Sequence, residues 1–132
     1  MEFVGKKYKL VSSENFDEFM KAIGAGMILR KAANTVTPIV ELRKDGDYFV
    51  LISSSTFKTV EIKFKPGEEF EEERFDGVKM KSVCTFEGNT LKHVQKDAEG
   101  NVVTNVREFG PDEMKTVMTL KDIVCTRMYK AC

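Results

Sequence analysis

The chain has 132 residues and a mass of 15.0 kDa, and its 21 basic residues balance 21 acidic ones. This length suits a single domain, residues 1–132, whose core needs neither a disulfide nor a metal. A net charge of zero argues against a nucleic-acid binder, which would carry a basic excess. The first residues contain no hydrophobic signal segment, and no later apolar run is long enough to span a membrane. We therefore expect a soluble, cytoplasmic protein.

The cysteines give no sign of a metal site. Cys84, Cys125 and Cys132 form an odd set that lacks the Cys-x-x-Cys or Cys/His spacing of metal ligands, so we expect reduced thiols and no metal or cofactor. Cys125 lies two residues before Arg127 on the same strand face, where a cation could favour the thiolate. The favoured interpretation is a small apolar wall residue, because buried free cysteines usually behave as hydrophobes.

A short strand at Tyr8 to Val11 is predicted first, and two short helices follow it. Asn15 with Glu18 three residues later resembles a capping box at the start of the first helix. Apolar residues then recur at helical spacing at Phe16, Phe19, Met20 and Ile23. Gly24 and Gly26 end this helix, and a second helix runs roughly from Met27 to Asn34. Residues from about 15 to 36 thus predict a helix-turn-helix that caps a core.

From residue 38 onward the apolar period changes to two, and turn residues recur at short intervals, which is typical of an antiparallel meander. The predicted turns are Asp45-Gly46, Ser53-Ser54-Ser55, Pro66-Gly67, Asp76-Gly77, Gly88-Asn89, Asp97 to Asn101, Gly110-Pro111-Asp112 and Lys121-Asp122. With the first strand, these turns delimit ten strands. An open sheet of many short strands exposes its edges, and closure removes them. We therefore expect a mainly β fold, an up-and-down barrel capped by two helices.

The strand faces that should point inward are unusually polar. Ser82, His93, Gln95, Asn105 and Arg107 all fall on faces selected by apolar neighbours. Such a mixture is awkward in a dry core but natural in a cavity that holds ordered water and an amphipathic guest.

Two arginines share inward faces with apolar residues. Arg127 lies on one face with Ile123 and Tyr129, and Arg107 lies on another with Phe109. Neither arginine has a carboxylate on its own strand face. Burying a cation without an anion is expensive, so the anion should come from elsewhere, most economically from a ligand. The alternative is that each arginine sits at a strand end and reaches water, as most arginines do.

Two other classes of function compete with ligand binding. In an enzyme, the only histidine, His93, would pair with Ser82 or Cys84 on the preceding strand. No nucleophile-elbow or triad motif surrounds these residues, and a lone strand histidine is more often structural. A module that only binds other proteins would leave the inward arginines unexplained. We therefore expect a binding protein and not an enzyme.

Several blocks of the chain resemble the intracellular lipid-binding proteins, in particular the fatty-acid-binding branch typified by the heart, adipocyte and myelin types. The blocks are KKYKLVSSENFDEFMKAI at 6–23, STFK at 55–58, EIKFK at 61–65, GEEF at 67–70, VRE at 106–108 and VCTRMY at 124–129. The resemblance implies a ten-stranded antiparallel β-barrel with a helix-turn-helix lid, of lipocalin-like (calycin) architecture. It also implies a monomer that reversibly binds and transports one long-chain fatty acid, such as palmitate, oleate or arachidonate.

Site residues follow from the resemblance by position. Arg107, Arg127 and Tyr129 correspond to the residues that hold the ligand carboxylate. The residues that should touch the tail, line the portal or order cavity water are Phe16, Phe19, Met20, Ala25, Ala33, Phe57, Asp76, Gln95, Thr116 and Met118. Phe75 and Thr116 depart from the heart type, so the chain preference stays open. Retinol is disfavoured, while a retinoic-acid carrier of the same family remains the alternative.

Basic residues on or beside the predicted lid suggest a transient membrane contact. Lys21, Arg30 and Lys31 are either a solvated helix face or a patch that touches anionic membranes during ligand transfer, as in several relatives. Comparable residues serve nuclear import in some family members, so the expected location is cytoplasmic, with the nucleus as a second site.

Overall fold

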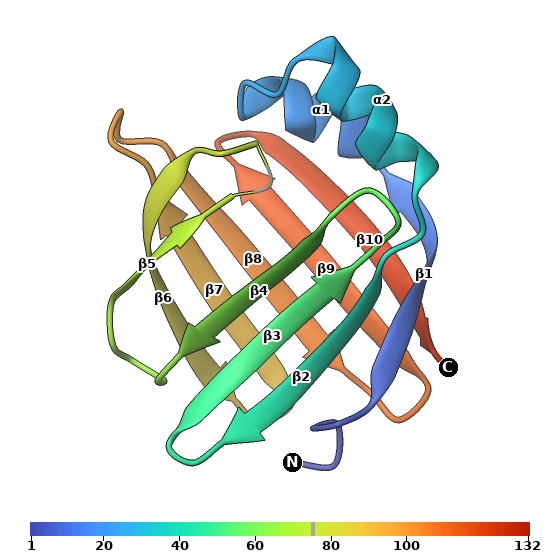
Figure 1. The fold of residues 1–132 in the computed structure, drawn as a ribbon, viewed down its shortest axis with the longest axis vertical. Helices are drawn as coiled ribbons and strands as arrows, with labels where there is room; N and C mark the ends of the chain where they lie inside the picture. Colours follow the sequence, from blue (N-terminus) through green and yellow to red (C-terminus); the bar gives the residue numbers. More distant parts are fainter. Residues whose placement is uncertain (75) are drawn as a thin grey trace.

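The computed structural model describes residues 1–74 and 76–132, so Phe75 lies outside the described residues. The described residues form two helices and ten strands (Figure 1). The helices are α1 (Phe16–Ala22) and α2 (Met27–Thr35). The strands are β1 (Lys7–Glu14), β2 (Ile39–Asp45), β3 (Tyr48–Ser54), β4 (Thr59–Phe64), β5 (Phe70–Glu73), β6 (Lys79–Glu87), β7 (Thr90–Lys96), β8 (Val102–Phe109), β9 (Glu113–Leu120) and β10 (Ile123–Ala131).

The strands form one antiparallel sheet that curls into a nearly closed barrel. Its order is β4-β3-β2-β1-β10-β9-β8-β7-β6-β5, so every neighbour but one is the next strand along the chain. The exception is β1, which pairs with β10 and with β2 and thereby joins the two halves. The sheet ends at β4 and β5, which face each other without appearing as a hydrogen-bonded pair in the described sheet. The predicted mainly β barrel is confirmed, and each predicted turn lies at a junction of two strands, although Asp45, Ser53 and Ser54 still belong to β2 and β3.

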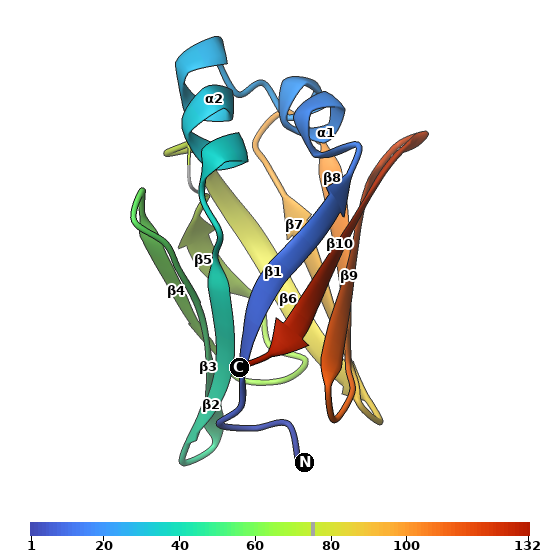
Figure 2. The same ribbon diagram turned by 90° about the vertical axis from the view of Figure 1, so that its right-hand side faces the viewer.

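The end of the barrel opposite the helices is closed by packed aromatic side chains. The N-terminal segment crosses this end (Figure 2), and Phe3 stacks on Phe109 with ring centroids 4.7 Å apart. Tyr8 is fully buried in the same cluster, and its hydroxyl donates a hydrogen bond of 2.8 Å to the Gly110 carbonyl. Burial of several aromatic residues here supplies a large part of the apolar driving force for folding. The dry core therefore occupies one end and leaves the other end free for a site.

The helices lie side by side across the opposite end of the barrel (Figures 1 and 2). Gly24 ends α1 with a φ of +91°, and the backbone N–H groups of Gly24 and Ala25 bond back to the carbonyls of Lys21 and Met20. This is the bonding pattern of a helix stop that needs a left-handed residue, which glycine adopts without steric strain. Neither helix in the described residues is long and apolar enough to cross a membrane.

The predicted capping box at Asn15 is wrong. Asn15 precedes α1 with a φ of +64° and makes no side-chain cap bond. Its side-chain amide donates instead to the Val124 carbonyl of β10, at 3.1 Å. A tertiary hydrogen bond thus replaces the local one that the sequence pattern suggests, and it fixes the start of the lid to the barrel wall.

Candidate ligand-binding site

A cavity of about 230 Å³ lies inside the barrel beneath the helices. Eleven of the thirteen residues predicted for the site line it: Phe16, Phe19, Met20, Ala33, Phe57, Gln95, Arg107, Thr116, Met118, Arg127 and Tyr129. The two others lie elsewhere. Ala25 is buried against Met20 and Ala33 between the helices, and Asp76 is paired with Arg74 beside the lid. The sequence thus identifies the cavity wall well, while contact of these residues with a ligand stays a prediction.

Arg127 is a buried cation for which the described residues provide no carboxylate. Only 8% of its surface is exposed, so the strand-end alternative is wrong for this residue. Its Nε donates to the Ser13 hydroxyl at 3.1 Å, and its guanidinium carbon lies 3.8 Å from the ring centroid of Phe16. Stacking on an aromatic ring offsets part of the cost of burial but supplies no negative charge. The Nη groups therefore remain available for an anion.

Arg107 is in a different situation, because an internal carboxylate lies near it. Its Nη1 contacts Nδ1 of His93 at 3.4 Å, and Nε2 of His93 contacts a carboxylate oxygen of Glu72 at 2.5 Å. The side chains of His93 and Glu72 are only 3% and 5% exposed. An internal carboxylate, Glu72, thus offsets part of the Arg107 charge through the imidazole, so this cation does not depend on a ligand alone. Contact of Arg107 with a ligand carboxylate stays a prediction.

The pKa shifts define the charges of Arg107, His93 and Glu72. Burial raises the pKa of the Glu72 carboxyl, but the hydrogen bonds that it accepts, chiefly the one from His93, outweigh this effect and hold the pKa below its ordinary value. Burial lowers the pKa of His93 and prevails over the hydrogen bond to Glu72, which raises it. Burial also lowers the pKa of Arg107, which stays charged at neutral pH. At neutral pH Arg107 is thus a cation, His93 a neutral imidazole and Glu72 an anion.

These contacts argue against the enzyme alternative. Both ring nitrogens of His93 are engaged, one with Glu72 and one with Arg107, and in the described part of the chain neither Ser82 nor Cys84 hydrogen-bonds to the ring. Burial raises the pKa of Cys84 to about 12 and that of Cys125 to about 11. Thiols with such pKa values are protonated at neutral pH and are poor nucleophiles. Both cysteines are packed in hydrophobic core clusters and do not appear among the residues that line the cavity.

The cavity wall formed by β5, β7 and β8 carries a network of hydrogen-bonded polar side chains. The Asn105 amide donates to the His93 carbonyl at 3.1 Å and to the side-chain oxygen of Gln95 at 3.0 Å, and Gln95 donates to Glu72 at 3.2 Å. Thr116 is 3% exposed, and its hydroxyl is buried without a hydrogen-bond partner. A network in which most groups are paired holds its side chains in fixed positions.

Sequence reasoning missed two charged residues of the site, Glu72 and Arg74. Arg74 lines the cavity and forms a buried ion pair with Asp76, with both Nε and Nη2 at 2.8 Å from its oxygens. Its Nη2 also donates to the Ile23 carbonyl at the end of α1, at 3.1 Å. Arg74 thus ties the turn after β5 to the lid.

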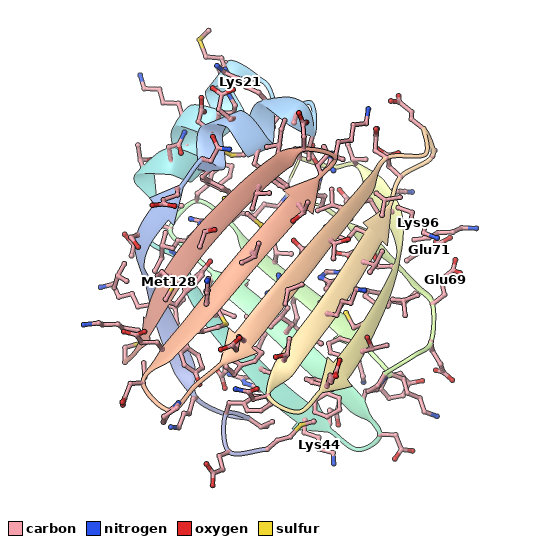
Figure 3. The ribbon with its side chains drawn as sticks, turned by 180° about the vertical axis from the view of Figure 1, so that it is seen from behind. Lys21, Lys44, Glu69, Glu71, Lys96 and Met128 are labelled. Carbon is pink, nitrogen blue, oxygen red and sulfur yellow. The ribbon has the colours of Figure 1, made fainter. Side chains whose placement is uncertain are left out.

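A signal for Glu72 was present in the sequence. Phe70 and Glu72 alternate with Glu71 and Glu73, so an inward Phe70 places Glu72 inside as well. Figure 3 shows Glu71 on the outside of the barrel, near Glu69 and Lys96. It also shows Met128 on the outer face of β10, between the inward Arg127 and Tyr129.

A model of the lipocalin / cytosolic fatty-acid binding protein family matches residues 4–131. The chain belongs to this family. It is 48% identical over 132 residues to the muscle fatty acid-binding protein of Schistocerca gregaria, covering 98% of this chain and 97% of that one. Members of this family are lipid carriers, which agrees with the expectation of a binding protein.

Solved structures of family members match the fold closely. The brain fatty acid-binding protein of Drosophila melanogaster superposes with a TM-score of 0.93 at 49% identity, covering 98% of this chain and 99% of that one. The Schistosoma mansoni fatty acid-binding protein, solved in complex with arachidonic acid, gives a TM-score of 0.93 at 40% identity, with 98% and 96% covered. Placement of this family member in the heart, adipocyte and myelin branch stays a prediction.

Proposed function

We propose that this family member reversibly binds one long-chain fatty acid in its cavity and carries it through the cytoplasm as a monomer. The observation that carries the proposal is Arg127, a buried cation that the described residues leave without a carboxylate. A ligand with a single negative charge balances it. The names of the relatives, which include fatty acid-binding proteins and a complex with arachidonic acid, support the same ligand class.

The proposed complex places the carboxylate on Arg127 and Tyr129, with Arg107 bound directly or through water. Charge-assisted hydrogen bonds from these groups select a carboxylate over an alcohol or an ester. The alkyl chain lies against the apolar wall beneath the lid, near Phe16 and Met118. Each buried methylene contributes about 0.8 kcal/mol, so a chain of palmitate length offers roughly 10 kcal/mol before the costs of association. The tail dominates affinity, and the headgroup sets orientation.

A calorimetric titration with palmitate, hexadecanol and all-trans retinoic acid tests this proposal. The expected result is one equivalent of palmitate bound, with hexadecanol bound at least tenfold more weakly. Tighter binding of retinoic acid than of palmitate would favour the retinoid-carrier alternative. Equal binding of palmitate and hexadecanol would refute the role of the buried cation.

The proposed transient membrane contact rests on a smaller positive charge than the sequence suggests. Lys21 lies 3.4 Å from Glu18 and Arg30 lies 3.2 Å from Asp17, so nearby carboxylates balance both. Lys31 is exposed, and two large apolar side chains, Met27 and Ile28, are 75% and 86% exposed at the start of α2. We expect contact through this apolar end of the lid, assisted by Lys31.

Transfer of a fluorescent fatty acid to anionic vesicles provides the test of this contact. Substitution of both Met27 and Ile28 with serine should slow transfer several-fold, and Lys31→Gln should reduce its dependence on salt. The matched control is Lys44→Gln, because Lys44 lies on β2 far from the lid (Figure 3). Unchanged transfer rates in the apolar variant would exclude the contact.

A further inference from the structure

Thr116 occupies a central position in the headgroup region. In the strand register it is the direct partner of Arg107 on β8 and of Arg127 on β10. Directly opposed residues of antiparallel strands point to the same face, with Cβ atoms about 5 Å apart. The three side chains therefore form a row across β8, β9 and β10, with the threonine between the two cations. Thr116 also lines the cavity.

The hydroxyl of Thr116 has no hydrogen-bond partner, although the residue is 97% buried, as its 3% exposure shows. A buried hydroxyl without a partner destabilises a protein, and valine would fill the same space on a strand without that penalty. In the present rotamer the hydroxyl is covered. Rotation to another staggered χ1 well, about 120° away, exchanges its position with that of the methyl group. A polar ligand atom in the cavity would then complete its hydrogen bonding.

A single carboxylate has too few lone pairs to accept hydrogen bonds from all of the donors on Arg107, Thr116 and Arg127. Arg127 keeps its Nη groups for an anion, since its Nε is bound to Ser13. A bidentate arginine and the hydroxyl of Tyr129 already occupy most of the lone pairs of a carboxylate. The Thr116 hydroxyl lies one strand away from Arg127, toward Arg107. The Thr116 hydroxyl is therefore placed to hydrogen-bond a further oxygen atom of the ligand, next to the carboxylate.

We propose that Thr116 forms an oxygen subsite beside the carboxylate site and that the protein takes 2-hydroxy fatty acids as ligands, with Thr116 bonded to the hydroxyl on C2. The inference rests on the proposed function, because the carboxylate must bind at Arg127. In this arrangement the threonine and ligand hydroxyls satisfy each other, since each has one donor and free lone pairs. An unsubstituted acid places a methylene next to the threonine and leaves its hydroxyl to water.

The test compares palmitate with the two enantiomers of 2-hydroxypalmitate by calorimetric titration of the wild-type protein, Thr116→Val and Thr116→Ser. The wild-type protein should bind one enantiomer at least as tightly as palmitate. Thr116→Val should weaken binding of that enantiomer about tenfold relative to binding of palmitate by the same variant, which matches a hydrogen bond of about 1.4 kcal/mol. Thr116→Ser keeps the hydroxyl and should preserve the wild-type ratio of the two affinities.

Thr119→Val is the matched control, because Thr119 lies on the same strand and is the cross-strand partner of Thr104 and Val124 on the outer face. It should leave both affinities unchanged. Thermal unfolding of ligand-free Thr116→Val should show a Tm equal to or above the wild-type value, which establishes that the variant folds. The proposal is overturned if both enantiomers bind more than tenfold more weakly than palmitate, or if Thr116→Val changes the affinity ratio by less than twofold. Absence of palmitate binding would overturn the proposed function as well.

Discussion

The contrast between Arg107 and Arg127 leads to opposite effects of the same substitution. Arg127→Gln removes a buried cation that lacks a carboxylate among the described residues, whereas Arg107→Gln removes a cation that Glu72 balances through His93. In the ligand-free protein, Arg127→Gln removes the cost of burying an unpaired guanidinium. Arg107→Gln instead leaves the buried Glu72 carboxylate without its compensating cation. Arg127→Gln should therefore raise the Tm by a few degrees, and Arg107→Gln should lower it by about 5 °C.

For palmitate binding, Arg127→Gln should be the more damaging of the two substitutions. Loss of one partner of a buried, hydrogen-bonded charge pair costs about 2–5 kcal/mol, and each 1.4 kcal/mol corresponds to a tenfold change. In the proposed complex Tyr129 and Arg107 also face the carboxylate, so we expect the lower end for Arg127→Gln, about 2–3 kcal/mol or roughly 30- to 150-fold weaker palmitate binding. Arg107→Gln should weaken palmitate binding less than Arg127→Gln does.

Calorimetric titration with palmitate and with hexadecanol, combined with thermal unfolding of the ligand-free variants, measures all of these quantities. Hexadecanol controls for packing of the tail, and its affinity should change less than threefold in either variant. Two results would refute the reasoning. One is an equal loss of palmitate and hexadecanol binding in Arg127→Gln, and the other is a lower Tm for ligand-free Arg127→Gln than for the wild-type protein.

Three further predictions concern the other charged groups. Glu72→Gln leaves Arg107 without its carboxylate and should tighten palmitate binding several-fold by titration while lowering the Tm; weaker binding would contradict the charge assignment. Because burial holds the pKa of His93 below its ordinary value of 6.5, stability should fall as pH drops below 6.5, and urea unfolding of His93→Gln between pH 7 and 5 should show a smaller fall; equal slopes would exclude this origin. Arg74→Gln frees the lid from the turn after β5 and should raise the palmitate dissociation rate about tenfold in stopped-flow experiments, whereas an unchanged rate would exclude a latch.

The alternation of side chains made the barrel and much of its wall predictable. Turn residues marked each hairpin, and a period of two placed Arg127 and Tyr129 on the inward face of the last strand. Glu72 was harder to see, because it lies in a run of glutamates that resembles a solvated surface. Only its spacing from Phe70 distinguishes it from its outward neighbours.

Contacts between distant segments could not be read from local patterns. Asn15 has the sequence of a helix cap, yet its amide bonds to the carbonyl of Val124, which is 109 positions away. Arg74 reaches the carbonyl of Ile23, 51 positions away, because the turn after β5 packs against the end of α1. Such hydrogen bonds depend on how the closed barrel brings the lid and the turns together, and propensity and periodicity carry no information about that geometry.

Native mass spectrometry of the gently purified protein, followed by extraction and identification of the bound molecule, tests the central claim most directly. We predict one equivalent of a fatty acid of about 16 to 20 carbons with a free carboxylate, which balances Arg127 and buries its chain under the lid. Recovery of a neutral lipid, such as an alcohol, an ester or retinol, would contradict the account. It would mean that the buried cation does not select the ligand.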